Sequence, residues 1–354
     1  MPINLPPDEA RFYFSPDRAA SPILDVVGAM ALRIAVAGLR LGIFDALAAG
    51  PRTAKDLAAD LSADPNALEL LLDALDGVGY LERTGTAYAN GPAAQSLRGD
   101  YGKILLFWDV LIGRLWGNLE ESIRTGRPGV DFYDWMADHP DTLARFQDLQ
   151  RANVDQLARD AVDAVPLPGD ATRLLDLGGG HGEFSVAYCR AYDRLSATMV
   201  DRPETLALAG ESLAAEGMSH RITLHAADLF DRMEFHDQDV VLLFRILHTF
   251  PPAQAQALIR AAVNTLRPGG KLLVLENYPV PGAGVADNAF FRSFALNLHH
   301  TQGGRLHSPD ELTAWIVEAG CSPPDRVALS GSPCDFLLVA SRQTTDHGRD
   351  GTAR

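Results

Sequence analysis

A short glycine-rich segment carries the first residues whose types and spacing could do chemistry. Residues 173–177 form an apolar run that ends abruptly in glycine, which predicts a buried strand and a tight turn. The turn reads D-x-G-x-G-x-G from Asp176 to Gly182, and residues 184–194 predict the helix that follows. Glycine lets a ligand lie against the bare main chain, and a helix start offers free N–H groups. The segment therefore predicts a binding loop for a polar or anionic ligand.

The spacing of these glycines excludes one common ligand. The dinucleotide fingerprint G-x-G-x-x-G would need glycine at Glu183 in one register and at Ser185 in the other. The pattern present instead resembles the first motif of class I S-adenosylmethionine (SAM) methyltransferases. That resemblance makes Asp176, Gly178 and Gly180 cofactor-binding residues.

Four further apolar runs alternate with helical stretches, at residues 197–201, 222–228, 240–244 and 271–276. Such alternation predicts an α/β fold with a doubly wound, Rossmann-like parallel sheet, which binds ligands at the carboxyl ends of its strands. Asp201 ends the second strand, where an acid can accept hydrogen bonds from both ribose hydroxyls. The methyltransferase resemblance adds four more cofactor residues, which are Asp228, Leu229, Phe244 and Arg245. Arg245 could equally form a structural ion pair.

Composition restricts the class of protein. The 354 residues carry a net charge of −15, which argues against broad binding to nucleic acid or to anionic membranes. The three cysteines lack metal-site or disulfide spacing, no apolar run reaches membrane-spanning length, and no signal sequence is evident. We expect a cytoplasmic enzyme or regulator with a small-molecule partner, no nucleic acid and no membrane.

The N-terminal part predicts a helical domain that ends in a hairpin. Residues 1–17 indicate a flexible arm, and residues 18–100 a winged helix whose hairpin turns at Gly85. A DNA-binding regulator is the competing interpretation. The recognition helix of such a regulator would be residues 65–77, and all the charged residues in this stretch are acidic. A DNA-binding helix needs positive charges there. We therefore interpret residues 18–100 as a dimerisation domain.

An aromatic helical bridge follows the winged helix, over residues 101–168. Most of its aromatic side chains are expected to form core, and Trp116 and Phe146 to line a substrate pocket beneath a lid. Residues 169–340 then form the SAM-binding catalytic domain, and the polar residues 341–354 form a tail.

Together these features resemble the plant-type O-methyltransferase family, including its bacterial natural-product members. The resemblance rests on the winged helix, the bridge, the glycine loop and Arg245-Ile-Leu-His248, and it covers residues 21–340. It implies a domain-swapped homodimer that methylates small phenolic acceptors in specialised metabolism such as antibiotic biosynthesis. It also gives His248 the role of general base and Glu276 that of the acid that orients it. A second orienting acid of the family is replaced here by Leu306.

Two adjacent histidines, His299 and His300, close the helix expected from about residue 286. With His248 they could form a metal site, since neutral imidazoles suit Zn or Fe. This resembles the branch of the family that C-methylates 2-oxo acids. A metal there would stabilise the enolate formed when the C3 proton of a chelated 2-oxo acid is lost. The histidine pair could equally serve packing or hydrogen bonding.

The sequence leaves the acceptor open. The main expectation is C-methylation at C3 of an arylpyruvate or branched 2-oxo acid. The alternative is metal-free O-methylation of a phenol with His248 as general base, and a third interpretation is a non-catalytic SAM-binding or winged-helix regulatory protein. In either catalytic interpretation, Phe291 and Phe294 join Trp116 and Phe146 in the substrate pocket.

Overall fold

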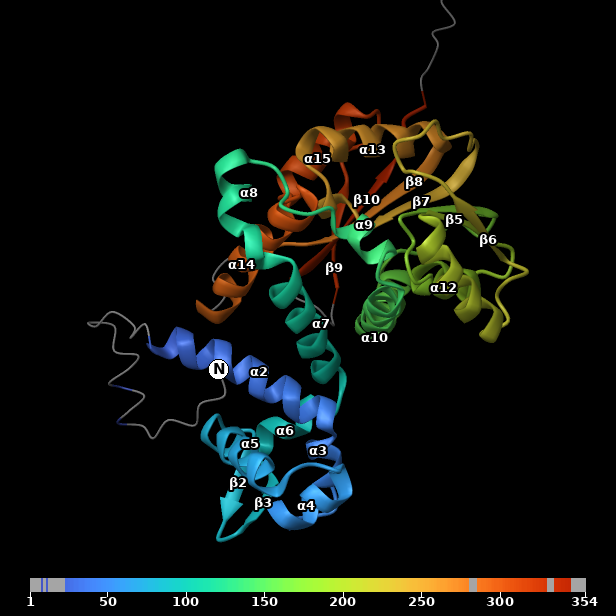
Figure 1. The fold of residues 1–354 in the computed structure, drawn as a ribbon. Helices are drawn as coiled ribbons and strands as arrows, with labels where there is room; N and C mark the ends of the chain where they lie inside the picture. Colours follow the sequence, from blue (N-terminus) through green and yellow to red (C-terminus); the bar gives the residue numbers. More distant parts are fainter. Residues whose placement is uncertain (1–7, 9–10, 12–22, 280–284, 330–333, 345–354) are drawn as a thin grey trace, which may run out of the picture. The chain divides into compact units, whose positions relative to one another are not determined.

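The chain folds into two compact units, Met1–Gly117 and Asn118–Arg354. The structure is a computed structural model, shown in Figure 1, and it describes residues 8, 11, 23–279, 285–329 and 334–344. Most of the expected arm and most of the expected tail lie outside these residues. Within the described part of the chain, no helix has the length and apolarity needed to cross a membrane.

The N-terminal unit has the helices and hairpin of the expected winged helix. Its elements are α2 (Ile23–Leu41), α3 (Ile43–Ala46), β1 (Arg52–Thr53), α4 (Ala54–Leu61), α5 (Pro65–Gly77), β2 (Leu81–Thr84), β3 (Ala87–Asn90), α6 (Pro92–Leu97), α7 (Asp100–Arg114) and the start of η1 (Trp116–Asn118). Thr53 and Asp64 cap α4 and α5 by accepting backbone N–H groups. Residues 101–117, expected in the bridge, group with this unit.

The acids of the would-be recognition helix α5 face the hairpin. Asp73 and Glu69 form ion pairs with Arg83 of β2, and Asp73 also accepts a hydrogen bond from the hydroxyl of Tyr88 on β3. The acidic side chains of α5 therefore hold the β2–β3 hairpin against this helix.

The second unit is built on a seven-stranded sheet in the order β6-β5-β4-β7-β8-β10-β9. Its elements are α8 (Leu119–Thr125), α9 (Phe132–Ala137), α10 (Pro140–Ala164), β4 (Arg173–Leu177), α11 (Glu183–Ala191), β5 (Ser196–Asp201), α12 (Pro203–Ala215), β6 (Ile222–Ala226), β7 (Gln238–Phe244), η2 (Leu247–Thr249), α13 (Pro252–Thr265), β8 (Leu266–Asn277), α14 (Val285–Gln302), α15 (Pro309–Glu318), β9 (Asp325–Ala328) and β10 (Asp335–Ser341). The predicted parallel strands are confirmed. Two further strands, β9 and β10, were not predicted from the sequence, and β10 pairs antiparallel with both β8 and β9.

The strand order places two loops side by side. β4 pairs in parallel with β5 on one side and with β7 on the other. The chain adds β5 and β6 on one side of β4 and then crosses to add β7 and β8 on the other side. Ligands of open α/β sheets bind at such a switch point, outside the carboxyl ends of the strands. The glycine loop after β4 and the turn after β7 both start there.

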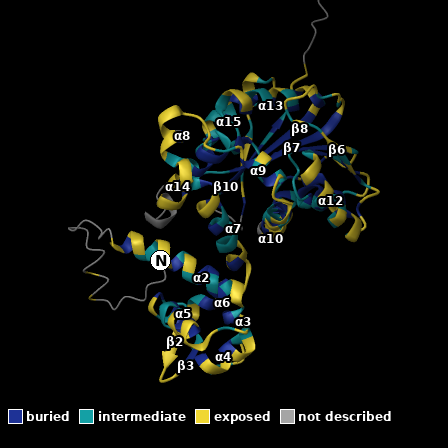
Figure 2. Ribbon diagram, viewed as in Figure 1, coloured by how far each residue is buried: buried dark blue, intermediate teal, exposed yellow. Residues whose placement is uncertain are grey.

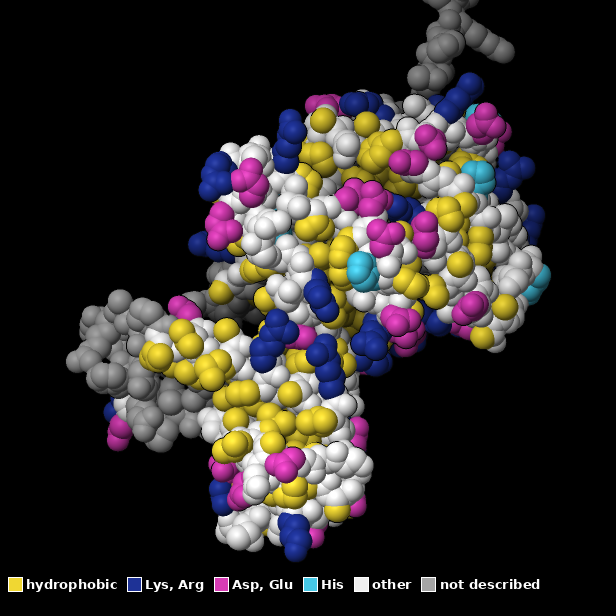
Figure 3. All heavy atoms as spheres, in the orientation of Figure 1, with side chains coloured by type: hydrophobic (Ala, Val, Ile, Leu, Met, Phe, Trp, Pro, Cys, Tyr) yellow, Lys and Arg dark blue, Asp and Glu magenta, His cyan; other side chains and the backbone are white. Residues whose placement is uncertain are grey.

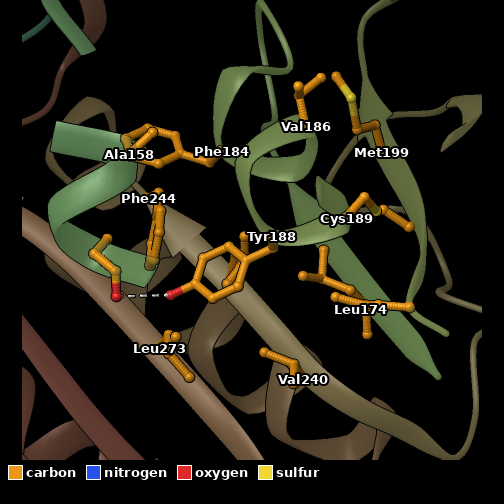
Figure 4. Packing of buried hydrophobic residues seen from close by; sticks show 14 of the residues in the cluster. Ala158, Leu174, Phe184, Val186, Tyr188, Cys189, Met199, Val240, Phe244 and Leu273 are labelled. Atoms are coloured by element: carbon orange, nitrogen blue, oxygen red, sulfur yellow. Dashed lines mark hydrogen bonds between the residues drawn. The ribbon is translucent and has the colours of Figure 1, made fainter. Parts of the chain in front are cut away.

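Helices cover both faces of this sheet, as Figure 2 shows by the buried strands between them. One core joins α10, α11 and α12 to the sheet, and the other joins α13 and α15 to its opposite face. In the first core, the hydroxyl of Tyr188 donates to the carbonyl of Ala161 at 3.3 Å, and the rings of Phe184 and Phe244 meet edge to face (Figure 4). Phe244 ends β7, so this core reaches the edge where the loops begin.

The capping box of α15 gives a test of local stability. The hydroxyl of Ser308 accepts the N–H of Glu311, whose side chain accepts the N–H of Ser308 in return. Ser308→Ala should lower the free energy of unfolding by about 1 kcal/mol because one N–H at the helix start loses its partner. Chemical denaturation measures this. Ser196→Ala, at an exposed serine that begins β5, is the control, and an equal effect of both changes would contradict the role of the cap.

Candidate active site

A cavity of about 470 Å³ lies at the carboxyl ends of β4, β5 and β7. This volume lies within the range of cofactor and small-molecule sites. All the residues predicted to bind the cofactor line it, namely Asp176, Gly178, Gly180, Asp201, Asp228, Leu229, Phe244 and Arg245. The structure thus brings together residues that are spread over 70 positions of the sequence, because parallel strands end at the same edge of the sheet.

The first glycine of the loop permits a close approach between two segments. Gly178 has φ of 76°, and a Cβ built on it would lie 2.7 Å from the Ile246 side chain, which also lines the cavity. A larger residue would both strain the backbone and collide with the turn after β7. The loop therefore needs glycine for its conformation and for its contact.

Asp201 is positioned to hold a ligand and to support the loop. Its Oδ2 accepts the N–H of Gly180 at 2.9 Å, and its Oδ1 accepts the N–H of Arg202 at 2.7 Å. A carboxylate has about four acceptor sites, so two hydrogen bonds leave others for ribose hydroxyls. Burial raises the pKa of Asp201 against the lowering effect of these bonds.

Asp176, the acid of the motif, has a different environment. It is 2 % exposed, and its Oδ2 accepts a hydrogen bond from the Ser185 hydroxyl at 2.7 Å. Burial raises the pKa of Asp176 to about 7, against the lowering effect of this bond. A positive ligand group in the cavity would favour its ionised form.

Helices α9 and α10 supply a wall of the cavity that sequence reasoning largely missed. Phe146 was predicted; the additional lining residues include Tyr133, Gln147, Gln150 and Val154. The α10 residues at 146, 147, 150 and 154 share one helical face, so their spacing was an available signal. Burial raises the pKa of Tyr133, which keeps its phenol protonated.

Arg245 forms the structural ion pair that the sequence analysis gave as one of its two possible roles. Its guanidinium pairs with the carboxylate of Asp335 on β10, and its N–H donates to the carbonyl of Leu275 at 2.8 Å. It also has φ of 59°, unusual for a residue other than glycine. Arg245 lines the cavity as well, so a contact with the cofactor stays a prediction.

His248 and Glu276 form a hydrogen-bonded pair on the turn after β7. The Nδ1 of His248 lies 2.6 Å from Oε2 of Glu276, while Oε1 of Glu276 accepts the N–H groups of Leu247 and His248 at 2.8 and 3.3 Å. Burial would raise the pKa of Glu276, but its interactions with His248, together with the positive charge of Arg245, outweigh burial and hold the pKa below the ordinary value. The ionised carboxylate accepts a hydrogen bond from Nδ1–H, which leaves the lone pair of the neutral His248 ring on Nε2.

The loop before α15 locks the same turn from the other side. The Nε2 of His307 lies 3.1 Å from the carbonyl of Leu247 and 3.2 Å from that of Phe250. Gly304 packs so closely that a Cβ built on it would lie 2.2 Å from the carbonyl oxygen of His248. Leu306, at the position where the family resemblance predicts a second acid, lies between these two residues in sequence.

The predicted metal site of His248, His299 and His300 is not assembled. Neighbouring residues of a helix point about 100° apart, so His299 and His300 diverge. His300 is fully buried, and its Nδ1 bonds the hydroxyl of Ser122 on α8 at 2.8 Å. Within the described ranges, no three His, Cys, Asp or Glu side chains group as metal ligands. The His300 side chain instead fastens α14 to α8.

The remaining aromatic residues predicted for the substrate pocket do not all lie in one place: Phe291 and Phe294 are on α14, and Trp116 is in η1. The ring of Phe294 lies 6.1 Å from that of His248, and it stacks in parallel with the ring of Phe290 at 6.0 Å. Phe291 is buried on the same helix. Trp116 belongs to the N-terminal unit, so its place in the pocket stays a prediction.

The cavity fits SAM by the chemistry of its wall. Asp201 offers acceptors for a ribose, Gly178 keeps the main chain bare, and one buried amide oxygen, Oε1 of Gln147, lacks a partner among the described residues. An orphaned acceptor in a cavity wall indicates a ligand that donates a hydrogen bond.

Asp201→Ala should abolish measurable binding of SAM or of its product, S-adenosyl-L-homocysteine, because the ribose would lose its acceptors and the loop its contact with Gly180. Isothermal titration calorimetry measures this. Asp193→Ala, at an exposed acid before β5, is the matched control. Unchanged binding in Asp201→Ala would contradict the assignment.

Comparisons with known proteins match both parts of the chain to one family. An O-methyltransferase domain family matches residues 116–322, and an O-methyltransferase dimerisation domain family matches residues 25–99. The solved structure of mitomycin 7-O-methyltransferase superposes with a TM-score of 0.79 at 23 % identity, covering 90 % of this chain and 96 % of that one. At this identity the likeness shows the fold.

Two relatives show the range of the family. The 3-hydroxy-5-methyl-1-naphthoate 3-O-methyltransferase of Streptomyces sahachiroi is 31 % identical over 295 residues, which cover 81 % of this chain and 84 % of that protein. The aclacinomycin 10-hydroxylase of Streptomyces purpurascens is 30 % identical over 337 residues, which cover 89 % and 87 %. The second name is not that of a methyltransferase, so the site must decide the reaction. With both domains matched, this chain belongs to the O-methyltransferase family and is a SAM-dependent methyltransferase.

Proposed function

We propose that the protein transfers the methyl group of SAM to a hydroxyl oxygen of an aromatic specialised metabolite. The observation that carries this proposal is the hydrogen bond between His248 and Glu276, which leaves a basic nitrogen on the turn beside the cofactor cavity. We also assign the predicted cofactor residues that line the cavity to SAM, with Asp201 on the ribose and Asp228 and Leu229 beside the adenine.

His248 acts as the general base. Its Nε2 takes the proton of the acceptor hydroxyl, and Glu276 stabilises the imidazolium that forms, because the carboxylate is ionised and bonded to Nδ1. The cofactor supplies an electrophilic methyl group on a sulfonium sulfur. Burial of Glu276 keeps water from competing for the pair, so the orientation of the imidazole is fixed before the acceptor binds.

An aromatic acceptor fits the surroundings of the base. The ring of Phe294 lies next to His248 and is parallel to the ring of Phe290, so it offers a flat apolar surface near the base for a planar acceptor. Among the relatives, the printed name of the Streptomyces sahachiroi enzyme specifies methylation of a hydroxyl on a naphthoate. Both observations favour a phenolic hydroxyl.

The main expectation from the sequence, C-methylation of a 2-oxo acid, finds less support. That reaction was tied to a metal held by His248, His299 and His300, and the His300 ring is committed to Ser122. O-methylation needs only the pair that is present.

The base pair gives a direct test of the reaction. With a hydroxynaphthoate as acceptor, His248→Ala should lower kcat by about 100-fold to 10,000-fold, the usual contribution of a general base. Glu276→Gln should lower it less, because the amide can still accept from Nδ1 but no longer stabilises its charge. Methyl transfer is followed by mass spectrometry, and the methylated atom by NMR.

Binding of S-adenosyl-L-homocysteine serves as the control, since it should stay unchanged in His248→Ala. Activity with phenylpyruvate in place of the phenol, and a methyl group on carbon, would contradict the proposal. So would full activity of His248→Ala.

We propose further that the protein works as a homodimer through helix α2, with the domain-swapped arrangement that the family resemblance implies. Ile23, Val26 and Met30 are spaced along one face of α2 and are 55 %, 52 % and 58 % exposed. Figure 3 shows the apolar side chains gathered on this helix. The matched dimerisation domain begins at residue 25, so this apolar face is the surface that a second copy would cover.

The double variant Val26→Asp/Met30→Asp should convert the dimer to monomer, because two charges would be buried in an apolar contact. Size-exclusion chromatography with light scattering measures the mass. Ile123→Asp, at an exposed apolar residue of α8, is the control. A double variant that remains dimeric would exclude this face as the interface.

A further inference from the structure

One side chain in the wall of the cofactor cavity has unmet hydrogen-bonding capacity. Gln147 is 8 % exposed and lines the cavity, and its Oε1 is buried without a partner among the described residues. This oxygen lies 3.6 Å from where a Cβ on Gly180 would be, so it faces the glycine loop. Leaving such an acceptor unpaired is costly, so the site is built for a donor that arrives with the ligand.

The donors of the cofactor limit what this ligand group can be. SAM donates from its adenine amino group, its ribose hydroxyls and its α-ammonium. Asp228 and Asp201 are assigned to the first two, which leaves the α-ammonium of the amino-acid end for Gln147.

His181, next to Gly180 in the sequence, can supply the hydrogen-bond donor that the carboxylate of the amino-acid end requires. The Nδ1 of His181 accepts the N–H of Glu183 at 3.1 Å, so the proton of the neutral ring is on Nε2. Burial, reinforced by the positive charge of Arg151, lowers the pKa of His181 to about 3, so the ring is neutral at physiological pH. His181 also lines the cavity, and its Nε2–H can donate to a carboxylate.

We propose that Gln147 and His181 form the subsite for the amino-acid end of SAM. The Oε1 of Gln147 accepts a hydrogen bond from the α-ammonium, and the Nε2–H of His181 donates one to the α-carboxylate. A donor and an acceptor side by side match the two charges that an amino acid carries. The subsite rests on the SAM assignment alone and is independent of which atom receives the methyl group.

Arg151 fixes the position of this subsite. It lies one helical turn after Gln147 on α10, and its guanidinium bonds Glu183 at 2.7 Å, Ser212 at 2.6 Å and Glu216 at 2.7 Å. Glu183 begins α11 beside the glycine loop, Ser212 lies on α12, and Glu216 directly follows α12. The network therefore holds the Gln147 face of α10 over the loop.

The test compares two nucleosides that differ at the amino-acid end. Gln147→Leu should raise the Kd of S-adenosyl-L-homocysteine about 10-fold, since a charged group loses its partner. It should leave the Kd of 5′-methylthioadenosine, which has no amino-acid end, unchanged. His181→Phe should show the same selectivity. Calorimetry measures all four values without any methyl acceptor.

Two further variants sharpen the assignment. Gln147→Glu keeps an acceptor and should retain binding of S-adenosyl-L-homocysteine. Gln156→Leu, at an exposed glutamine of the same helix, should change neither Kd. If Gln147→Leu impairs folding, Gln147→Met replaces it with a side chain of similar length.

Three results would overturn the proposal. Equal binding of S-adenosyl-L-homocysteine by wild type and Gln147→Leu would remove Gln147 from the site. A matching loss for 5′-methylthioadenosine would place its contact on the ribose or adenine. Weaker binding by Gln147→Glu would show that the amide donates to the carboxylate, so that the ammonium lies elsewhere. None of these results bears on His248 as the base.

Discussion

The site depends on one buried carboxylate. Glu276, the penultimate residue of β8, is 2 % exposed and accepts three hydrogen bonds from the turn after β7, two from backbone N–H groups and one from the His248 ring. A buried charge is tolerated only where such partners compensate its lost hydration. The same bonds decide which nitrogen of His248 keeps its lone pair. The carboxylate thus fixes the turn, the tautomer and the base together.

The cofactor cavity depends on a second set of charges, farther from the chemistry. Arg151 joins α10 to α11 and α12 through carboxylates and a hydroxyl, and it is only partly exposed. Without this network, only apolar contacts would hold α10 on the sheet. Apolar contacts are less directional than charge-assisted hydrogen bonds, so they define the position of the helix less closely. Gln147 and Gln150 of the same helix line the cavity with polar side chains.

Family membership and mechanism rest on different observations here. A relative at 30 % identity is named a hydroxylase, so the fold permits more than one reaction. The hydrogen-bonded His248 and Glu276 are what favour methyl transfer to oxygen. At Leu306, where the family resemblance implies a second acid, no carboxylate is present, and His307 and Gly304 contact the backbone of the turn from the same loop.

The sequence by itself determined the winged helix, the parallel strands and the residues at their ends, because periodicity, caps and glycine act over short stretches of chain. Asp201 and Gly178 follow from such local patterns, as does their meeting at one edge of the sheet. Only the tertiary structure decided that His300 packs on Ser122, that Arg245 pairs with Asp335 and that Gln147 faces Gly180. Side-chain direction depends on how helices pack on the sheet, and that packing is a balance of many distant contacts, which no short segment encodes.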